Sequence, residues 1–467
     1  MSNESIQTAP ARQGLTRAIC EIIHAEHQRA LSPELTAAAR QAILDGLAVG
    51  VAGTTERAPQ IAAEHAQSQG GHPVSTVLAL GFKTSPVLAA AVNGMAIHVL
   101  DFEAMWSPPT HTTSPTLPVV LALAESQNRT GADILRAFVA GCEIQGRLRL
   151  ASGQYELEGV TFHPPGVVGV VGAAVAASCI MGAGVEQLRH AIGLAASRAG
   201  SLIGNVGSMA KCTHCGTAAA LGLDAALLAA RGFMANPDIL EAPKGFIDAF
   251  FDPATFDDEA LLAYGHPHRL LDPGLTFKMF PAQFATHWAV TAGLEARKQI
   301  ADPATIRSVR LTTPVMKYVD RPAPRSGLEG KFSFQYAVAA ALLDGAVGIA
   351  SYTDARRFRH DMETFLPKVQ LHQTTEIVGE IERMHVELSV ELSTGERVDV
   401  RCDGPRGARG RPRVSADEHL VKVQDCLATR LPAATAQRCI DRVLRLETLD
   451  AGDVRELMRD FGGETLS

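Results

Sequence analysis

The first half of the chain is a succession of Ala-rich amphipathic segments separated by Gly and Pro. From about Leu31 to about Leu240, apolar residues recur at the three- and four-residue spacing that predicts packed helices. Ser32 before Pro33 is typical of a helix start, because Pro fits the first helical turn. Four glycines fall where apolar runs stop, as helix-ending glycines do: Gly182, Gly193, Gly232 and Gly245. We therefore expect this half to be all-helical.

The pattern changes in the second half of the chain. The segments IRSVRLTTP from Ile306 and MHVELSVELSTGERVDVRC from Met384 alternate apolar with polar residues, which predicts strands with one buried face. A Thr-Gly-Glu sequence inside the second segment predicts a hairpin turn. A helical pattern from Phe332 separates the two segments, so residues 275–405 predict a small α+β unit, and residues 415–467 return to helical patterning.

The chain is long enough for more than one folding unit. Its 467 residues exceed what one hydrophobic core usually supports, so two domains are expected. We assign residues 1–274 to the first part of a helical domain, residues 275–413 to an inserted α+β domain, and residues 414–467 to the rest of the helical domain. The predicted fold class is mainly α, with a large all-helical domain formed by both chain ends.

Composition and charge exclude several classes of protein. The chain is 46% hydrophobic and 20% charged, as in a well-buried globular protein. The formal net charge of −7 is small, and the one basic run, Arg406 to Arg413, has no aromatic residues for base stacking, so we expect no nucleic-acid partner. Polar residues or Gly interrupt every apolar run before about 18 residues, so we expect no transmembrane helix and no membrane partner.

Cysteine usage and motifs narrow the chemistry. The N-terminus lacks the basic-then-apolar order of a secretory signal, and eight Cys are too sparse for a disulfide scaffold, so reduced thiols in a cytoplasm are expected. Cys212 and Cys215 have the spacing of a zinc or redox site but no second pair follows at zinc-ribbon distance. Neither H-E-x-x-H, G-x-S-x-G nor a Walker-type loop occurs. We expect neither a metal nor a cofactor.

Several ionisable residues lie in apolar or turn-rich segments, where burial costs free energy unless something compensates. Asp101 and His111 flank a Pro-rich turn between predicted helices, and His163 precedes Pro-Pro at a helix start. Lys211 and His214 are one helical turn apart, so both could point into one cleft. Taken singly, each of these residues also fits a structural role, such as a satisfied hydrogen bond.

Lys278 lies at the expected domain junction, where clefts and active sites are common. A buried Lys can lose its proton and serve as a base, or it can keep its charge and bind a carboxylate. The surrounding residues therefore allow either role for Lys278, and a surface salt bridge is the structural alternative.

Seven segments, in order, resemble the MmgE/PrpD family over nearly the whole chain. They are NGMAIHVLDFEAMW, HTTSPTLPVVLALAE, GCEIQGRL, FHPPGVVG, LAARGF, FKMFPAQFATHW and FSFQYAVAAALLDG. The resemblance implies a helical domain built from both chain ends, an inserted α+β lid that closes over a small di- or tricarboxylate, and a homodimer. It also places the active-site set of the decarboxylase branch on five residues: Asp101, His111, His163, Lys211 and Lys278.

Three positions depart from the family pattern. Met105 replaces a Thr of the decarboxylases, Gln283 replaces a His, and Ala104 breaks the paired-Asp run of the family. Because a titratable His is missing, we expect an epimerase that resembles iminodisuccinate epimerase. A dehydratase or decarboxylase is the alternative, and a non-catalytic carboxylate-binding homodimer is the alternative of another class.

The expected roles follow from the chemistry that the family shares, the breaking of a bond near a carboxylate through a carbanion-like state that nearby cations stabilise. Lys211 and His163 are assigned to proton transfer, His111 and Lys278 to carboxylate binding or acid chemistry, and Asp101 to orientation of these groups. His214 and Gln283 complete the candidate site as substrate-binding residues.

Overall fold

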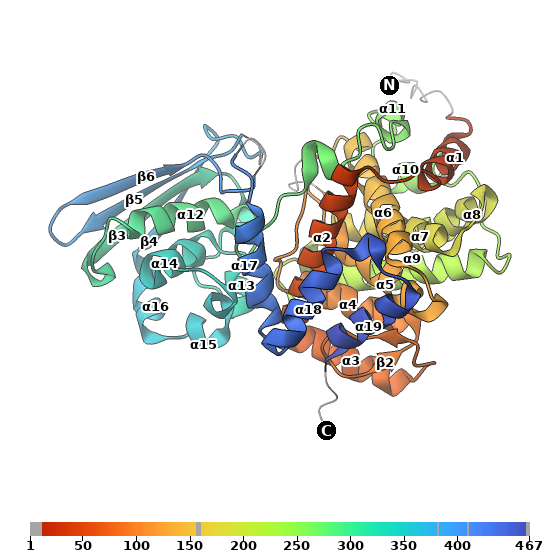
Figure 1. Cartoon of the computed structure of the whole chain (residues 1–467). Helices are drawn as coiled ribbons and strands as arrows, with labels where there is room; N and C mark the ends of the chain where they lie inside the picture. Colours follow the sequence, from red (N-terminus) through yellow and green to blue (C-terminus); the bar gives the residue numbers. More distant parts are fainter. Residues whose placement is uncertain (1–11, 156–159, 381–382, 409–410, 464–467) are drawn as a thin grey trace, which may run out of the picture.

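A computed structural model describes residues 12–155, 160–380, 383–408 and 411–463. Its described part is mainly helical, with two lobes side by side in Figure 1. The helical lobe begins with these elements: α1 (Leu15–His27), α2 (Pro33–Gly53), α3 (Arg57–Gln69), β1 (Ser75–Thr76), β2 (Lys83–Thr84), α4 (Pro86–Val99), α5 (Thr113–Gln127), α6 (Gly131–Ala151), α7 (Pro164–Met181), α8 (Val185–Ala196), α9 (Thr213–Ala229), α10 (Phe246–Phe250) and α11 (Asp258–Leu262).

Local sequence explains where several of these helices begin and end. The Ser32 hydroxyl accepts a hydrogen bond from the Leu35 amide at the start of α2, with Pro at the first helical position. Gly182 ends α7 in the left-handed conformation, as predicted. The same prediction is wrong for Gly193, which lies inside α8. The close packing there explains the Gly, since a Cβ would lie 2.8 Å from the Asn236 carbonyl oxygen. The prediction is also wrong for Gly245, which precedes α10.

The first half is not entirely helical. β1 and β2 form a two-stranded antiparallel sheet in which Ser75 pairs with Thr84. These strands occur where the chain folds back between α3 and α4, over a length too short for a periodic pattern.

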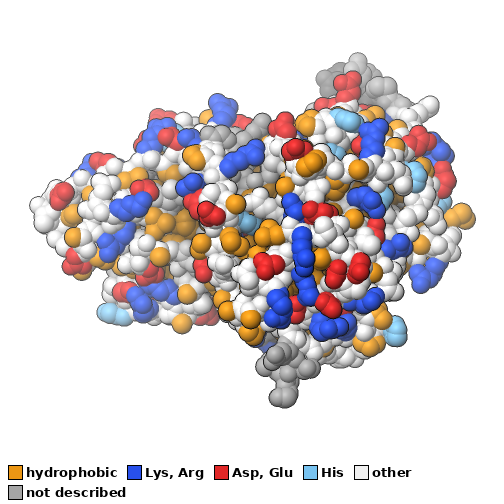
Figure 2. Space-filling view, in the orientation of Figure 1, with side chains coloured by type: hydrophobic (Ala, Val, Ile, Leu, Met, Phe, Trp, Pro, Cys, Tyr) orange, Lys and Arg blue, Asp and Glu red, His pale blue; other side chains and the backbone are white. Residues whose placement is uncertain are grey.

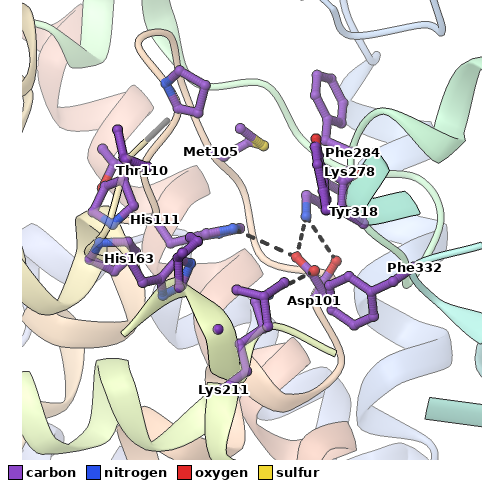
Figure 3. Close-up of a pocket in the computed structure, with 18 of the residues that line it drawn as sticks. Asp101, Met105, Thr110, His111, His163, Lys211, Lys278, Phe284, Tyr318 and Phe332 are labelled. Atoms are coloured by element: carbon purple, nitrogen blue, oxygen red, sulfur yellow. Dashed lines mark hydrogen bonds and ion pairs between the residues drawn. The ribbon is translucent and has the colours of Figure 1, made fainter. Parts of the chain in front are cut away.

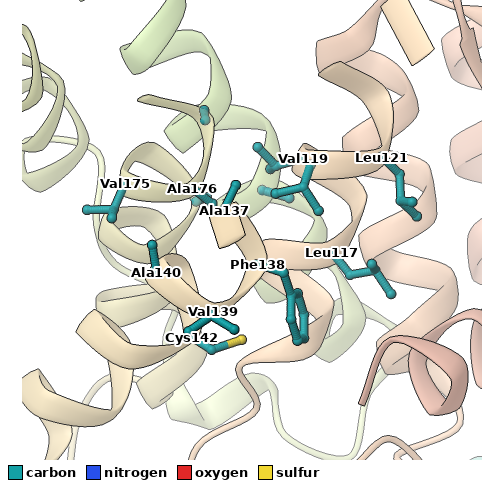
Figure 4. Close-up of a cluster of buried hydrophobic side chains, with 14 of the residues drawn as sticks. Leu117, Val119, Leu121, Ala137, Phe138, Val139, Ala140, Cys142, Val175 and Ala176 are labelled. Atoms are coloured by element: carbon teal, nitrogen blue, oxygen red, sulfur yellow. The ribbon is translucent and has the colours of Figure 1, made fainter. Parts of the chain in front are cut away.

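The core of the helical lobe is built around α7, which packs against α6 and α9. Figure 4 shows part of this core, which includes Val119, Phe138 and Val175. Small residues allow the close approach of the helices, since a Cβ at Gly222 would lie 2.4 Å from the Val170 carbonyl oxygen.

Three helical stretches are long and apolar enough to cross a membrane by length and composition: Pro33–Gly53, Pro164–Met181 and Met209–Ala229. The expectation of no transmembrane helix rested on uninterrupted apolar runs, and mean hydropathy is a less strict measure. In the structure, 72%, 94% and 67% of their most apolar windows are buried inside the protein. Their apolar side chains therefore serve the core of the helical lobe.

The smaller lobe contains a four-stranded sheet with the order β4-β3-β5-β6, in which β3 and β4 are parallel and the other pairs are antiparallel. The hairpin between β5 and β6 turns at Gly395, as predicted. Helices α12 and α14 pack together and against the sheet, with a hydrophobic core separate from that of the helical lobe. The elements are α12 (Thr286–Arg297), β3 (Ile306–Pro314), α13 (Gly327–Gly330), α14 (Phe334–Asp344), α15 (Asp354–Arg357), α16 (His360–Phe365), β4 (Val369–Thr374), β5 (Val386–Leu392) and β6 (Arg397–Cys402).

The chain then returns to the helical lobe. Helices α17 (Ala416–Leu427), α18 (Ala433–Val443) and α19 (Ala451–Gly462) pack on α2 and α5, and they share one core with the first half of the chain. Figure 2 shows charged side chains of both signs interspersed over the face in view. The expected boundaries at 274/275 and 413/414, and the lid role of the smaller lobe, stay predictions.

Candidate active site

A cavity of about 480 Å³ lies where the two lobes meet (Figure 3). The helical lobe lines it with Asp101, Met105, Pro109, Thr110, His111, Val160, His163, Pro164, Pro165, Ile203, Gly204, Val206 and Lys211. The smaller lobe and the segment that leads to it contribute Lys278, Gln283, Phe284, Lys317, Tyr318, Arg321 and Phe332. Residues far apart in the sequence thus share one cavity.

Asp101 lies at the centre of this site. It follows α4 and has a φ of 52°, in the left-handed region that side-chain-bearing residues rarely adopt. Its Oδ2 accepts a 2.8 Å hydrogen bond from Lys211 Nζ, and its Oδ1 accepts one from Lys278 Nζ. Burial alone would raise the pKa of Asp101, but the two ammonium groups hold it well below its usual range. Asp101 is therefore a fixed anion between two cations.

Lys211 and Lys278 reach Asp101 from different parts of the chain. Lys211 belongs to a short 3-10 helix, Met209–Cys212, and its Nζ lies 5.3 Å from the ring centroid of Phe332. Lys278 also donates to the backbone carbonyl of Ala282 at 3.3 Å. Burial lowers the pKa of Lys278, and the nearby Asp101 carboxylate opposes this shift. Two ammonium groups beside one carboxylate leave an excess of positive charge, which favours an anionic ligand.

The three predicted histidines lie close to these groups. His111 Nε2 is 3.6 Å from Asp101 Oδ1, and His163, at the start of α7, places its Nδ1 3.1 Å from Nδ1 of His214. His111 and His163 line the cavity, whereas His214 contacts His163 from α9 and is not among the lining residues. The sequence suggested that Lys211 and His214 could both face one cleft, but of the two only Lys211 lines the cavity.

Burial holds these histidines in the neutral state. It is the largest cause that lowers the pKa of His111, His163 and His214, and the positive charge of nearby lysines lowers it further, to about 4 for His214. All three imidazoles are neutral at pH 7. A neutral imidazole has a free lone pair that can accept a proton or a hydrogen bond, although the lowered pKa makes His111 and His163 weaker bases than an exposed His.

His98 and Glu103 belong to the same cluster but were not predicted. His98 Nδ1 lies 2.7 Å from Glu103 Oε1, and the ring centroids of His98 and His111 are 4.8 Å apart. Burial raises the pKa of Glu103 to about 8, although hydrogen bonds from Ser114 oppose the shift. A signal was available, because His98 is three residues before Asp101 and Glu103 is two residues after it.

Gln283 lines the cavity, as expected for a substrate-binding candidate. Its Nε2 donates a 3.0 Å hydrogen bond to the Tyr318 hydroxyl, and its Oε1 accepts one from the Ala285 amide. Tyr318, Lys317 and Arg321 were not predicted, and a basic, aromatic segment after a strand was their one available signal. Lys317 and Arg321 add two further cations to the cavity wall.

One group in the cluster has the composition of a metal site. Ligand atoms of His98, Glu103 and His111 lie within 4.8 Å of one another. The Glu103 carboxyl group already bonds to His98, and its Oε1 and Oε2 accept hydrogen bonds from the Ser114 hydroxyl and amide at 2.6 and 2.9 Å. Hydrogen bonds from His98 and Ser114 therefore already satisfy both oxygens of this carboxyl group. Cys212 and Cys215 are both buried free thiols whose pKa burial raises.

Known proteins match the chain through both lobes. Residues 17–259 match the MmgE/PrpD N-terminal domain, and residues 280–448 match the MmgE/PrpD C-terminal domain. The chain is 33% identical to cis-aconitate decarboxylase of Mus musculus over 451 residues, which cover 94% of this chain and 92% of the relative. It is 33% identical to the Homo sapiens protein of that name over 450 residues, 94% of this chain and 93% of the relative. The cis-aconitate decarboxylase-like protein oryM of Aspergillus oryzae is 25% identical over 454 residues, 91% of this chain and 92% of the relative.

Proposed function

Because the chain belongs to the MmgE/PrpD family, we propose that it is a lyase that removes a carboxylate from a small unsaturated tricarboxylate. Cis-aconitate is the first candidate substrate, since the similar relatives carry its name. This reverses the order predicted from the sequence, in which epimerisation came first and a lyase second.

The observation that carries the proposal is the excess of positive charge in a cavity with many apolar walls. Lys211 and Lys278 give the cavity a positive charge beyond that of Asp101, which favours the carboxylates that remain on the product, and Arg321 lines the same cavity although it also pairs with Glu329 at 3.3 Å. Met105 and Phe284 are buried apolar neighbours. A carboxylate held against apolar side chains is poorly solvated. Such a carboxylate leaves as neutral carbon dioxide more readily than a carboxylate that a cation binds.

The proposed reaction needs one proton at carbon. The bond between a CH2 carbon and its carboxylate breaks, and carbon dioxide leaves without the bonding electrons. The electron pair moves through the adjacent double bond to the far carbon, which takes one proton. A trianion and one proton thus give carbon dioxide and a dianion with a terminal double bond.

We assign that proton to Lys211, because Asp101 fixes its ammonium group at the cavity wall. His111 then binds a carboxylate of the substrate, and Lys278, whose three N–H groups are already engaged, stabilises through its charge the negative charge that develops on carbon. His163 is a neutral base beside the same cavity. A proton from solvent water restores the Lys211 ammonium group after each turnover.

Epimerisation next to a carboxylate is the second candidate. His163 can take a proton from the α-carbon because burial keeps its imidazole neutral at pH 7, and Lys211 can return one. Because Gln283 cannot exchange a proton, His163 and Lys211 are left as the one base and the one acid, which is all that epimerisation needs. These are the two groups that the sequence assigned to proton transfer.

Proton NMR in D₂O, with cis-aconitate, 2-methylcitrate, citrate and iminodisuccinate supplied separately, distinguishes the candidates. Carbon dioxide release with one deuterium in the product supports the decarboxylase, and alkene formation from a hydroxy acid indicates a dehydratase. Deuterium at an α-carbon with inversion and no lost fragment indicates the epimerase. If no substrate reacts but a carboxylate raises the melting temperature, the chain is a binding protein, and the lyase proposal is wrong. Lys211→Met, which removes the proton donor, is the matched control.

We further propose that the enzyme works without metal or cofactor as a homodimer, as the family resemblance implies, and in a cytoplasm, as its cysteine usage predicts. Activity that survives dialysis against a chelator supports the first part, and loss that added metal restores contradicts it. Light scattering reports the mass in solution, and a tagged chain reports its compartment.

A further inference from the structure

The turn that carries Asp101 is held by lysines from three distant parts of the chain. Consecutive carbonyl oxygens of residues 100–102 accept hydrogen bonds at 3.3, 3.1 and 2.8 Å from Lys331, Lys278 and Lys422, in that order. All three lysines are buried. Burying a charged amine is costly unless its N–H groups find acceptors. The three carbonyl groups of this turn provide such acceptors, so the turn and the buried lysines stabilise one another. We call these three lysines the lysine clamp.

Lys422 is anchored on its other side by Asp45. Lys422 Nζ donates to Asp45 Oδ1 at 2.7 Å, and Asp45 Oδ2 accepts a 3.0 Å hydrogen bond from the Ala104 amide. The Lys422 ammonium group also lies 4.1 Å from the ring centroid of Phe102. Burial alone would raise the pKa of Asp45, but Lys422 and the hydrogen bond from His419 lower it. The ionised pair therefore fixes both ends of residues 102–104.

Lys331 reaches the turn from the smaller lobe. It is only 2% exposed, and burial lowers its pKa to about 8. Its own carbonyl accepts a 3.0 Å hydrogen bond from the Gln283 amide, and the next residue, Phe332, lines the cavity. Lys331 thus connects the Asp101 turn with the cavity wall of the other lobe.

The conformation of Asp101 explains why the turn needs these contacts. A φ of 52° is unfavourable for a residue with a side chain, and such a conformation persists when the surrounding structure fixes it. If the turn relaxed, the carboxylate of Asp101 would leave its place between Lys211 and Lys278. The contacts that fix the backbone therefore also fix the charges in the cavity.

We infer that Lys331 and Lys422 are positioning residues for the reaction: they hold the Asp101 turn in place and link the active site to the smaller lobe and to α17. The kinetic consequence rests on the proposed function. The placement of the turn does not.

The kinetic test compares Lys331→Met and Lys422→Met with Lys331→Arg and with wild type. We expect kcat to fall about 10- to 100-fold in the Met variants with KM changed less than about threefold, because a shift of about 1 Å in a catalytic group has that effect. Lys331→Arg keeps a donor and should restore part of the loss. Lys368→Met is the matched control, since Lys368 Nζ donates to the Ile306 carbonyl in the smaller lobe, away from the turn; its kcat should equal that of wild type.

Hydrogen exchange of residues 98–106, followed by mass spectrometry, tests the clamp without any substrate. We expect this segment to exchange at least about tenfold faster in both Met variants while α7 keeps its slow exchange, which shows that the lobe remains folded. Unchanged exchange, or a kcat no lower than in Lys368→Met, overturns the inference. If wild type converts no carboxylate, the proposed function fails, and the exchange result alone decides whether the lysines hold the turn.

Discussion

Replacing Asp101 by Asn would leave two buried ammonium groups without the anion that lies between them. The side chain keeps its size, but Lys211 and Lys278 lose their shared ion-pair partner. Removing one partner of a buried ion pair costs about 3–5 kcal/mol, because the remaining charge is left unpaired. We expect this loss in the unfolding free energy of Asp101→Asn at neutral pH. Activity should fall about 10²- to 10⁴-fold, the usual contribution of a positioned acid or base.

The size of that loss should depend on pH, with a sign set by the lysines. Burial lowers the pKa of Lys278 and Asp101 raises it, so in the variant this pKa falls further. The unfolded chain, with a Lys pKa of about 10.4, then binds more protons than the folded chain, and stability rises with pH up to that value. In wild type, the lowered pKa of Asp101 means that its contribution is lost only at acidic pH, as the pH falls through the folded value. The deficit of the variant should therefore shrink as the pH rises from neutral toward about 10.4.

Urea unfolding followed by circular dichroism at several pH values measures this deficit. Asp399→Asn is the control, because Asp399 forms an exposed ion pair with Arg397 at 2.8 Å and should contribute less than about 1 kcal/mol. An Asp101→Asn deficit below about 1 kcal/mol, or one that stays constant with pH, would show that the two lysines do not depend on Asp101 for compensation.

Lys278→Ala should lower kcat/KM at least about 100-fold because it removes a cation from the cavity, and full activity in a steady-state assay would refute the placement of the active site at the lobe junction. Burial raises the pKa of Glu103 to about 8, so the folded chain holds a proton that the unfolded chain releases, and wild-type stability should fall as pH rises from about 4 to 8. Glu103→Gln mimics the neutral form, so unfolding titrations of this variant should show a smaller slope. Gly53→Ala should cost about 1–3 kcal/mol in unfolding free energy, since its Cβ would lie 1.8 Å from the Ala96 carbonyl oxygen, whereas Gly200→Ala meets nothing within 4 Å and should cost less in the same assay.

The strands of the smaller lobe were predictable from the sequence where their signal is local. Strict alternation and a Gly-containing turn predict β3, β5 and β6, and the structure has all three. β4 was missed. It pairs in parallel with β3 across a long connection, so no adjacent hairpin marks its register.

The candidate site divides in the same way. Asp101, Lys211 and Lys278 stand out because each is ionisable in unusual local surroundings. Lys331 and Lys422 do not, because their contacts with the turn span 231 and 320 residues along the chain. The positions of the charged groups in the cavity depend on such long-range contacts, which the spacing of apolar residues along the chain cannot predict.

The return of α17 to the helical lobe has a consequence for synthesis of the protein. Apart from Met105, the core of the smaller lobe comes from the contiguous residues 282–408, so it is complete when this stretch has left the ribosome. The helical lobe at that moment still lacks three helices, and Asp45 still lacks Lys422. A nascent chain therefore finishes its second lobe before its first. The Asp101 turn gains its contact with Lys422 only after α17 has emerged, so the active-site residues are synthesised well before a residue that holds their turn.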